Sequence, residues 1–233
     1  MDVTSGHTLD RLGAVAGLAA VALLVSLMAV LPALPGPDRP IAEITQSAID
    51  DRSSLLLGSY LGALIAGALL VFGAAVASSI RRRDPDNGWW IVAVAGMTGT
   101  AAVGIVSSAL VVAFVRAVEH GARGDALWIG YSGDHALGTL IAIPLGIFLL
   151  GAGLGARAAR ALPRWLMWIA LAGAAALLLG AGSITGDELE GGPLGIPLVL
   201  GYLALLVWIV GTSLVLWRGR GESFPTMEVA TAR

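Results

Sequence analysis

The stretch "SSLLLGSYLGALIAGALLVFGAAVASSI", Ser53–Ile80, decides the fold, because none of its side chains is charged. A helix needs about 20 apolar residues to cross the hydrocarbon core of a bilayer. Backbone groups in lipid must be hydrogen-bonded within the segment, so a single stretch of this kind can cross only as a helix. Three consecutive arginines, Arg81–Arg83, follow it directly. The stretch therefore predicts a transmembrane helix that ends at a membrane surface.

Five further charge-free stretches predict five more spans. The full set is Leu12–Pro37, Ser53–Ile80, Asn87–Val115, Ala136–Ala156, Trp165–Gly186 and Gly191–Trp217. Alternating polar and apolar residues, the pattern of an outer-membrane barrel, do not occur. We therefore expect an all-α, polytopic membrane protein in which residues 1–217 form one bundle of six transmembrane helices. The polar residues 218–233 are predicted to be a disordered cytoplasmic tail.

The composition agrees with a lipid-facing surface and excludes several functions. Only 13% of the residues are charged, against about 25% in a soluble domain. The net charge of −2 gives no reason to expect a nucleic acid as partner. The chain has no cysteine, which excludes disulfides and thiolate metal sites. It also has no lysine, which excludes cofactors held as a Schiff base, such as retinal and pyridoxal phosphate.

The arginines predict the orientation of the spans. If the N-terminus lies in the cytoplasm, ten of the 14 basic residues fall on the cytoplasmic side, as the positive-inside rule requires. Five tryptophans lie near the same ends of their spans: Trp89, Trp90, Trp165, Trp168 and Trp217. We expect both termini in the cytoplasm and a multi-pass protein of the plasma membrane.

The segment after the first span predicts a short amphipathic helix on the outer surface. Asp38 can cap a helix there, and Pro40 suits its first turn. The apolar residues Ile41, Ile44, Ala48 and Ile49 fall on one face at helical spacing. We interpret this helix as a lid that packs on the end of the bundle, in preference to a site for a partner.

Inside the spans, the sequence predicts packing features and no charge. Glycine pairs four residues apart, such as Gly13 with Gly17 and Gly151 with Gly155, predict close helix approach within the monomer. Pro144 and Pro197 are predicted to kink the fourth and sixth spans. Every ionisable side chain except tyrosine is expected at a span end or beyond. That expectation argues against an ion-coupled transporter, since charges within a membrane mark ion and proton pathways.

The remaining polar chemistry is predicted to gather at the outer ends of the spans. The candidate cluster consists of Asp134, His135, His120, Glu119 and Glu188. His120 ends the third span and His135 begins the fourth, so we expect them to approach each other. Imidazole and carboxylate groups could bind zinc, and two histidines could bind haem. Neither a metalloprotease motif nor a comparable ligand spacing is present, so we predict no metal and no cofactor.

Helix capping is a sufficient explanation for the "SGDH" sequence at Ser132–His135. Ser132 or Asp134 can cap the start of the fourth span, where a carboxylate also complements the helix dipole. Catalysis by Asp134 and His135 is then not required.

The order of parts resembles a group of small actinobacterial integral membrane proteins and a broader bacterial membrane family of unknown function. The resemblance rests on Ile49–Arg83 and on Gly138–Gly182, with "ALPRWLMWIALAG", Ala161–Gly173, as its most specific part. It extends from the first span to the sixth. It implies a six-helix membrane protein and brings no catalytic residues with it.

Three functions remain open at this point. We expect a non-catalytic membrane protein that binds a partner subunit, a second copy of itself or an apolar or lipid ligand between its helices. The alternative is a small transporter or permease-like protein. The second alternative is a membrane enzyme that uses the outer-face histidine and acid cluster.

Overall fold

The computed structural model describes residues 3–32, 35–36, 39–122, 124–185 and 194–218, and these residues form helices and no strand. Six segments are long and apolar enough to cross a membrane: Thr8–Val30, Arg52–Arg83, Trp89–Glu119, Leu127–Ala158, Arg164–Ile184 and Gly195–Arg218. The predicted all-α class and the presence of six helices suited to crossing a membrane are therefore confirmed. The predicted tail, residues 218–233, lies outside the described residues except for Arg218.

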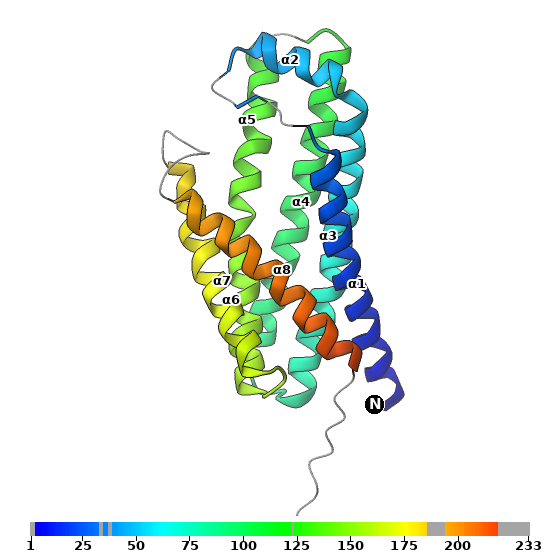
Figure 1. The fold of residues 1–233 in the computed structure, drawn as a ribbon, viewed down its shortest axis with the longest axis vertical. Coiled ribbons are helices and arrows are strands. Elements are labelled where there is room, and N and C mark those ends of the chain that lie inside the picture. Colours follow the sequence, from blue (N-terminus) through cyan, green and yellow to red (C-terminus); the bar gives the residue numbers. More distant parts are fainter. Residues whose placement is uncertain (1–2, 33–34, 37–38, 123, 186–193, 219–233) are drawn as a thin grey trace, which may run out of the picture.

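The spans pack side by side as a bundle (Figure 1), and their contacts close into a ring. The helices are α1 (Val3–Val30), α2 (Ile41–Asp50), α3 (Arg52–Arg83), α4 (Trp89–Glu119), α5 (Asp125–Leu140), α6 (Ala142–Ala158), α7 (Arg164–Gly180), the 3-10 helix η1 (Ala181–Thr185) and α8 (Gly195–Arg218). Following the chain, α1, α3, α4, α6, α7 and α8 each contact the next, and α8 closes the ring on α1. α5 lies outside this ring and packs mainly on α4.

Three aromatic rings form the centre of the bundle. Phe72 of α3, Phe148 of α6 and Trp208 of α8 are all fully buried. Their ring centroids lie 5.5 to 6.5 Å apart in edge-to-face arrangements, the geometry that aromatic quadrupoles favour. Since these side chains come from three different helices, they fix α3, α6 and α8 relative to one another.

Glycines allow the helices around this centre to approach closely, as predicted. A Cβ atom at Gly17 would lie 2.7 Å from the Phe72 ring, and one at Gly151 would lie 2.5 Å from the backbone nitrogen of Ala93. At Gly96 a Cβ would lie 2.4 Å from the backbone nitrogen of Phe148. Each of these contacts is within the monomer, so the predicted packing role of the Gly17 and Gly151 pairs is confirmed.

The helix predicted after the first span is α2, which covers one end of the bundle (Figure 1). Ile44 and Ala48 are buried in a second apolar cluster with Leu55, Phe114 and Tyr131, whereas Ile49 is exposed. α2 begins after Pro40, and the cap residue predicted for it, Asp38, lies outside the described residues. The helix therefore packs on the bundle as a lid.

The fourth span is broken where the sequence predicted a kink. α5 ends at Leu140 and α6 begins at Ala142, with Pro144 in the first turn of α6. Proline has no N–H to donate to the Leu140 carbonyl, so one hydrogen bond of the helix is missing there, although Ile141 keeps helical dihedral angles of −60° and −22°. The kink predicted at Pro197 is wrong, because α8 begins at Gly195 and Pro197 lies in its first turn, where proline is tolerated.

Candidate functional site

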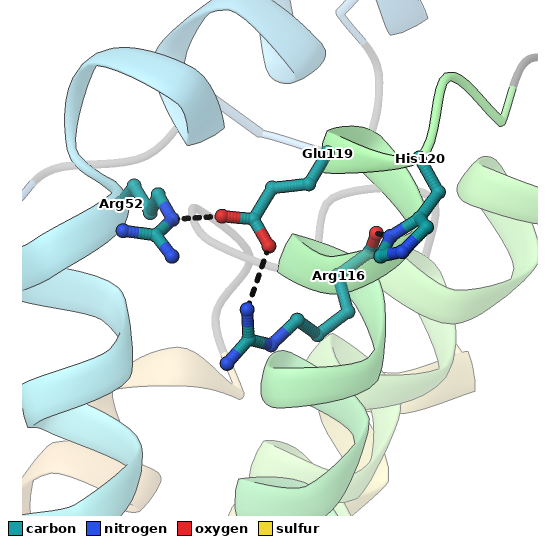
Figure 2. Close-up of polar contacts among 4 residues, drawn as sticks. All are labelled: Arg52, Arg116, Glu119 and His120. Atoms are coloured by element: carbon teal, nitrogen blue, oxygen red, sulfur yellow. Dashed lines mark hydrogen bonds and ion pairs between the residues drawn. The ribbon is translucent and has the colours of Figure 1, made fainter.

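The candidate residues Glu119 and His120 lie at the end of the bundle that α2 covers (Figure 2). The Glu119 carboxylate accepts hydrogen bonds from Arg52 of α3 and from Arg116, whose Nη1 lies 3.0 Å from Glu119 Oε2. His120 caps the C-terminus of α4, with its Nδ1 2.8 Å from the Arg116 carbonyl oxygen. These exposed contacts tie the ends of α3 and α4 together and leave the Glu119 carboxylate occupied by two arginines.

Asp134 does not cap a helix, so the capping explanation is wrong. α5 begins at Asp125, after Gly124, which makes Asp134 the tenth residue of the helix. The apolar segment that contains it, Leu127–Ala158, starts nine residues before the predicted span. Asp134 and His135 therefore lie inside this apolar segment, seven and eight residues after Leu127, and not before its start, where the sequence placed them.

Asp134 contacts the middle of a neighbouring span. Ser107 Oγ of α4 donates a hydrogen bond to Asp134 Oδ1 at 2.5 Å, and both side chains are half-buried. α4 contains 31 residues and is therefore about 46 Å long, and Ser107 lies about 5 Å along the axis from its midpoint. Because the hydrocarbon core of a bilayer is about 30 Å thick, this pair lies within the core when α4 spans the membrane.

The predicted approach of His120 and His135 is not found. α4 and α5 are antiparallel, with Ser107 and Asp134 at the same level. His120 is 13 residues beyond Ser107, whereas His135 directly follows Asp134, so about 20 Å along the helix axes separates the two histidines. The candidate cluster therefore divides into Glu119 and His120 at the bundle end and Asp134 and His135 inside the span. Glu188 lies outside the described residues.

The helix break lies one to two turns from Asp134. Gly138, one turn along the same face of α5, accepts a hydrogen bond from Tyr202 Oη of α8 at 3.4 Å. The Leu140 carbonyl at the break has no donor four residues later, because residue 144 is proline. Ser132 of α5 has a buried hydroxyl without a hydrogen-bond partner among the described residues. Further polar groups therefore lie near Asp134 on α5, the half of the span that precedes the break.

This arrangement can hold and release a proton more readily than it can hold a metal. A hard cation such as Mg²⁺ or Ca²⁺ takes six or more oxygen ligands. No group of three histidine, aspartate or glutamate side chains comes together among the described residues. A carboxylate that meets a hydroxyl donor needs no further ligand to bind a proton.

The sequence reasoning missed Ser107 and the depth of Asp134. A span bounded by charged residues begins only after His135, which places Asp134 outside it. One signal was present: Leu127, Trp128, Ile129 and Tyr131 form an apolar turn and a half before Asp134. Which residue of α4 contacts Asp134 depends on the register of α4 against α5, and local sequence patterns do not determine that register.

No family model, no curated protein and no solved structure matches the chain.

Proposed function

We propose that the protein is a small permease-like transporter of the plasma membrane, in which Asp134 binds and releases a proton during transport. The observation that carries this proposal is the Asp134 carboxylate, which lies inside a segment long and apolar enough to span a membrane and contacts Ser107 of the preceding span. An ionisable group within the bilayer is costly, and such groups in membrane proteins line ion and proton pathways. The sequence argued against a transporter only because it predicted no such group.

The broken span supports the same function. In many secondary transporters the substrate and the coupling ion bind near the membrane midplane, beside helices that are interrupted there. The break at Ile141 lies beside Gly104, the midpoint of α4, because a Cβ there would be 3.8 Å from Ile141 Cδ1. We infer that the missing hydrogen bond at Leu140 lets α5 tilt against α6 near the middle of the membrane, with Asp134 on the moving half.

The other two functions have less support. The hypothesis of a membrane enzyme required the histidines and acids to lie in one site, but His120 and His135 lie about 20 Å apart along the helix axes. The hypothesis of a non-catalytic binding protein depended on the expectation that the spans contain no charged side chain. Binding of a lipid is a separate property, which we assign below to a groove between α7 and α8.

The orientation that we propose has both termini in the cytoplasm. The end of the bundle with Arg81–Arg83, Arg157, Arg160 and Arg164 then faces the cytoplasm, and α2 covers the outer end. Reporter fusions after Arg83 and Arg164 should report cytoplasm, and a fusion after Asp125 should report the outside. The reverse pattern would contradict the orientation and would turn the α2 lid to the cytoplasm.

The experiment that tests the function measures proton uptake into vesicles containing the purified protein. An inside-negative potential is imposed with potassium and valinomycin, and an internal pH dye reports acidification. Wild-type protein should acidify the interior faster than protein-free vesicles, whereas Asp134→Asn should match them, because an amide cannot carry a proton. Asp134→Glu should retain part of the uptake. Asp10→Asn is the control, because that carboxylate pairs with Arg82 at the arginine-rich end and should leave uptake unchanged.

A second measurement does not depend on the transported substrate. Dicyclohexylcarbodiimide is an apolar reagent that modifies protonated carboxyl groups within a membrane. Mass spectrometry of the digested protein should find the modification on Asp134 and not on Glu119. Unmodified Asp134, together with wild-type uptake no faster than in protein-free vesicles, would contradict the proposed function.

A further inference from the structure

A groove of about 180 Å³ lies between α7 and α8 at the arginine-rich end of the bundle, away from Asp134. It is lined by Pro163, Trp165, Gly211, Leu214, Val215 and Arg218. The groove residues of α8 share one face of the helix, because Leu214, Val215 and Arg218 follow Gly211 by three, four and seven residues. An apolar floor therefore leads along α8 to a guanidinium group.

Gly211 gives the groove its depth. A Cβ atom there would lie 2.6 Å from Leu166 Cδ2 and 2.9 Å from Trp165 Cη2. The two helices are therefore in contact at Gly211, and this contact is the closed end of the groove. Toward Arg218 the apolar side chains become accessible, and Leu214 is 45% exposed.

The open end of the groove carries positive charge that no described residue neutralises. Arg218 lines the groove, and Arg164, which is exposed, stands between the lining residues Pro163 and Trp165. The ion pairs of the described residues involve Arg52, Arg82 and Arg116, and neither Arg164 nor Arg218. α7 also begins at Arg164 without a side-chain cap, and an uncapped helix start adds a positive dipole end to the same place.

The geometry points to a binding site for an anionic phospholipid, with an acyl chain along Gly211, Leu214 and Val215 and the headgroup phosphate on Arg164 and Arg218. Charge complementarity selects this occupant, because basic pockets between spans on the cytoplasmic side bind anionic headgroups. Two neighbouring tryptophans indicate that the open end of the groove lies at the level of the lipid headgroups. Trp165 and Trp217 are about half exposed, and tryptophan is enriched where lipid headgroups lie. This inference is independent of the transport proposed for Asp134.

The test compares lipid retention by native mass spectrometry of protein released from nanodiscs. The nanodiscs contain equal amounts of phosphatidylglycerol and phosphatidylcholine of the same chain length. Wild-type protein should retain phosphatidylglycerol in preference, and the Arg164→Gln/Arg218→Gln double variant should lose at least nine-tenths of it. Arg157→Gln is the matched control, because Arg157 is exposed at the same end but does not line the groove. It should retain phosphatidylglycerol like the wild type.

Two further variants separate a lipid site from a general effect of charge. Leu214→Trp fills the apolar floor while keeping both arginines, and it should also lose the retained lipid. Arg164→Lys/Arg218→Lys keeps the charge and should restore most of the retention, which would assign the loss in the glutamine double variant to the missing charge. Inorganic phosphate at millimolar concentration should not displace the lipid, because it has no chain to occupy the floor.

Three results would overturn the inference. The first is equal retention of phosphatidylglycerol and phosphatidylcholine by the wild type. The second is unchanged retention in both the glutamine double variant and Leu214→Trp. The third is a protein dimer that Leu214→Trp dissociates while lipid retention stays the same, which would assign the groove to contact between two copies of the chain.

Discussion

α5 and α6 are two halves of one apolar span, but they are built differently. Ten of the 17 residues of α6 are buried, and the helix packs between α4 and α7 in the ring. Among residues 127–140 of α5 the buried side chains are Leu127, Tyr131 and Thr139. The polar Asp134 and Ser132 both belong to α5. α6 is therefore mainly a packing helix, whereas α5 carries partly buried polar groups.

Glycine content alone does not distinguish the two halves. Gly151 of α6 faces the backbone of Ala93 so closely that a Cβ would lie 2.5 Å from its nitrogen. A Cβ at Gly130 or Gly138 of α5 would meet nothing within 4 Å. The glycines of α6 bring helices together, and those of α5 leave open surface. The comparison teaches that a small residue in a span has a packing role only where a neighbouring backbone reaches it.

The largest expected effect comes from truncating the aromatic centre. Phe148→Ala in α6 removes a fully buried ring that contacts Phe72 and Trp208, and such a change costs about 3–5 kcal/mol. Trp128→Ala in α5 is the control, because Trp128 is 48% exposed. Thermal unfolding in detergent should show a large loss of stability for Phe148→Ala and little for Trp128→Ala. Similar losses in both variants would contradict the difference between the halves.

A smaller effect is expected from adding one methyl group to each half. Gly151→Ala forces α6 and α4 apart, and overpacking of this kind costs about 1–3 kcal/mol. Gly138→Ala adds a methyl group where no atom lies within 4 Å, and alanine favours a helix over glycine by roughly 0.5–1 kcal/mol. The melting temperature should therefore fall for Gly151→Ala and stay constant or rise for Gly138→Ala. A fall for Gly138→Ala would indicate that a neighbour covers α5.

The difference between the halves also explains what the sequence could predict. The spans, the α2 helix, the Gly151 contact and the break near Pro144 follow from local rules on hydropathy, spacing and proline, and each was predicted. The depth of Asp134 was not, because a charge was treated as the boundary of a span. A membrane helix can carry a carboxylate when a neighbouring side chain such as Ser107 meets it, and that pairing depends on tertiary register.

The register itself is set outside the spans. The turn between α4 and α5 contains Gly121 and Gly124 with φ of 75° and 72°, a conformation that glycine adopts readily. These glycines fix where α5 starts and so which residue of α4 faces Asp134. The spans predicted from the sequence left residues 116–135 between them, so the level of His135 relative to His120 could not be predicted.

Loss of the hydroxyl that contacts Asp134 should have a modest effect on stability. Ser107→Ala removes one half-buried hydrogen bond, which is worth about 1 kcal/mol. Ser26→Ala is the control, because Ser26 is exposed and bonds only to the Ala22 carbonyl of its own helix. Ser107→Ala should lower the melting temperature slightly and should slow proton uptake into vesicles. Unchanged uptake would mean that Asp134 does not depend on this contact.

The smallest change in stability is expected at the joint between the two halves. Pro144→Ala restores an N–H that can donate to the Leu140 carbonyl, so it favours continuation of α5 into α6. Proline costs about 3 kcal/mol in the interior of a helix, but it is tolerated in the first turn of α6. The gain should therefore be below about 1 kcal/mol. Part of it is offset because Pro144 packs on Gly99, where a Cβ would lie 3.1 Å from Pro144 Cβ.

The effect of Pro144→Ala on motion should exceed its effect on stability. The chain contains no cysteine, so spin labels on cysteines introduced at Ile129 and Arg157 report only the α5 to α6 distance. Their distance distribution should narrow in Pro144→Ala, because a continuous hydrogen-bond ladder stiffens the joint. Proton uptake should fall with it, since α5 can no longer tilt independently of α6. If the distribution and the uptake both match the wild type, the break is held by packing against α4 and proline is not its cause.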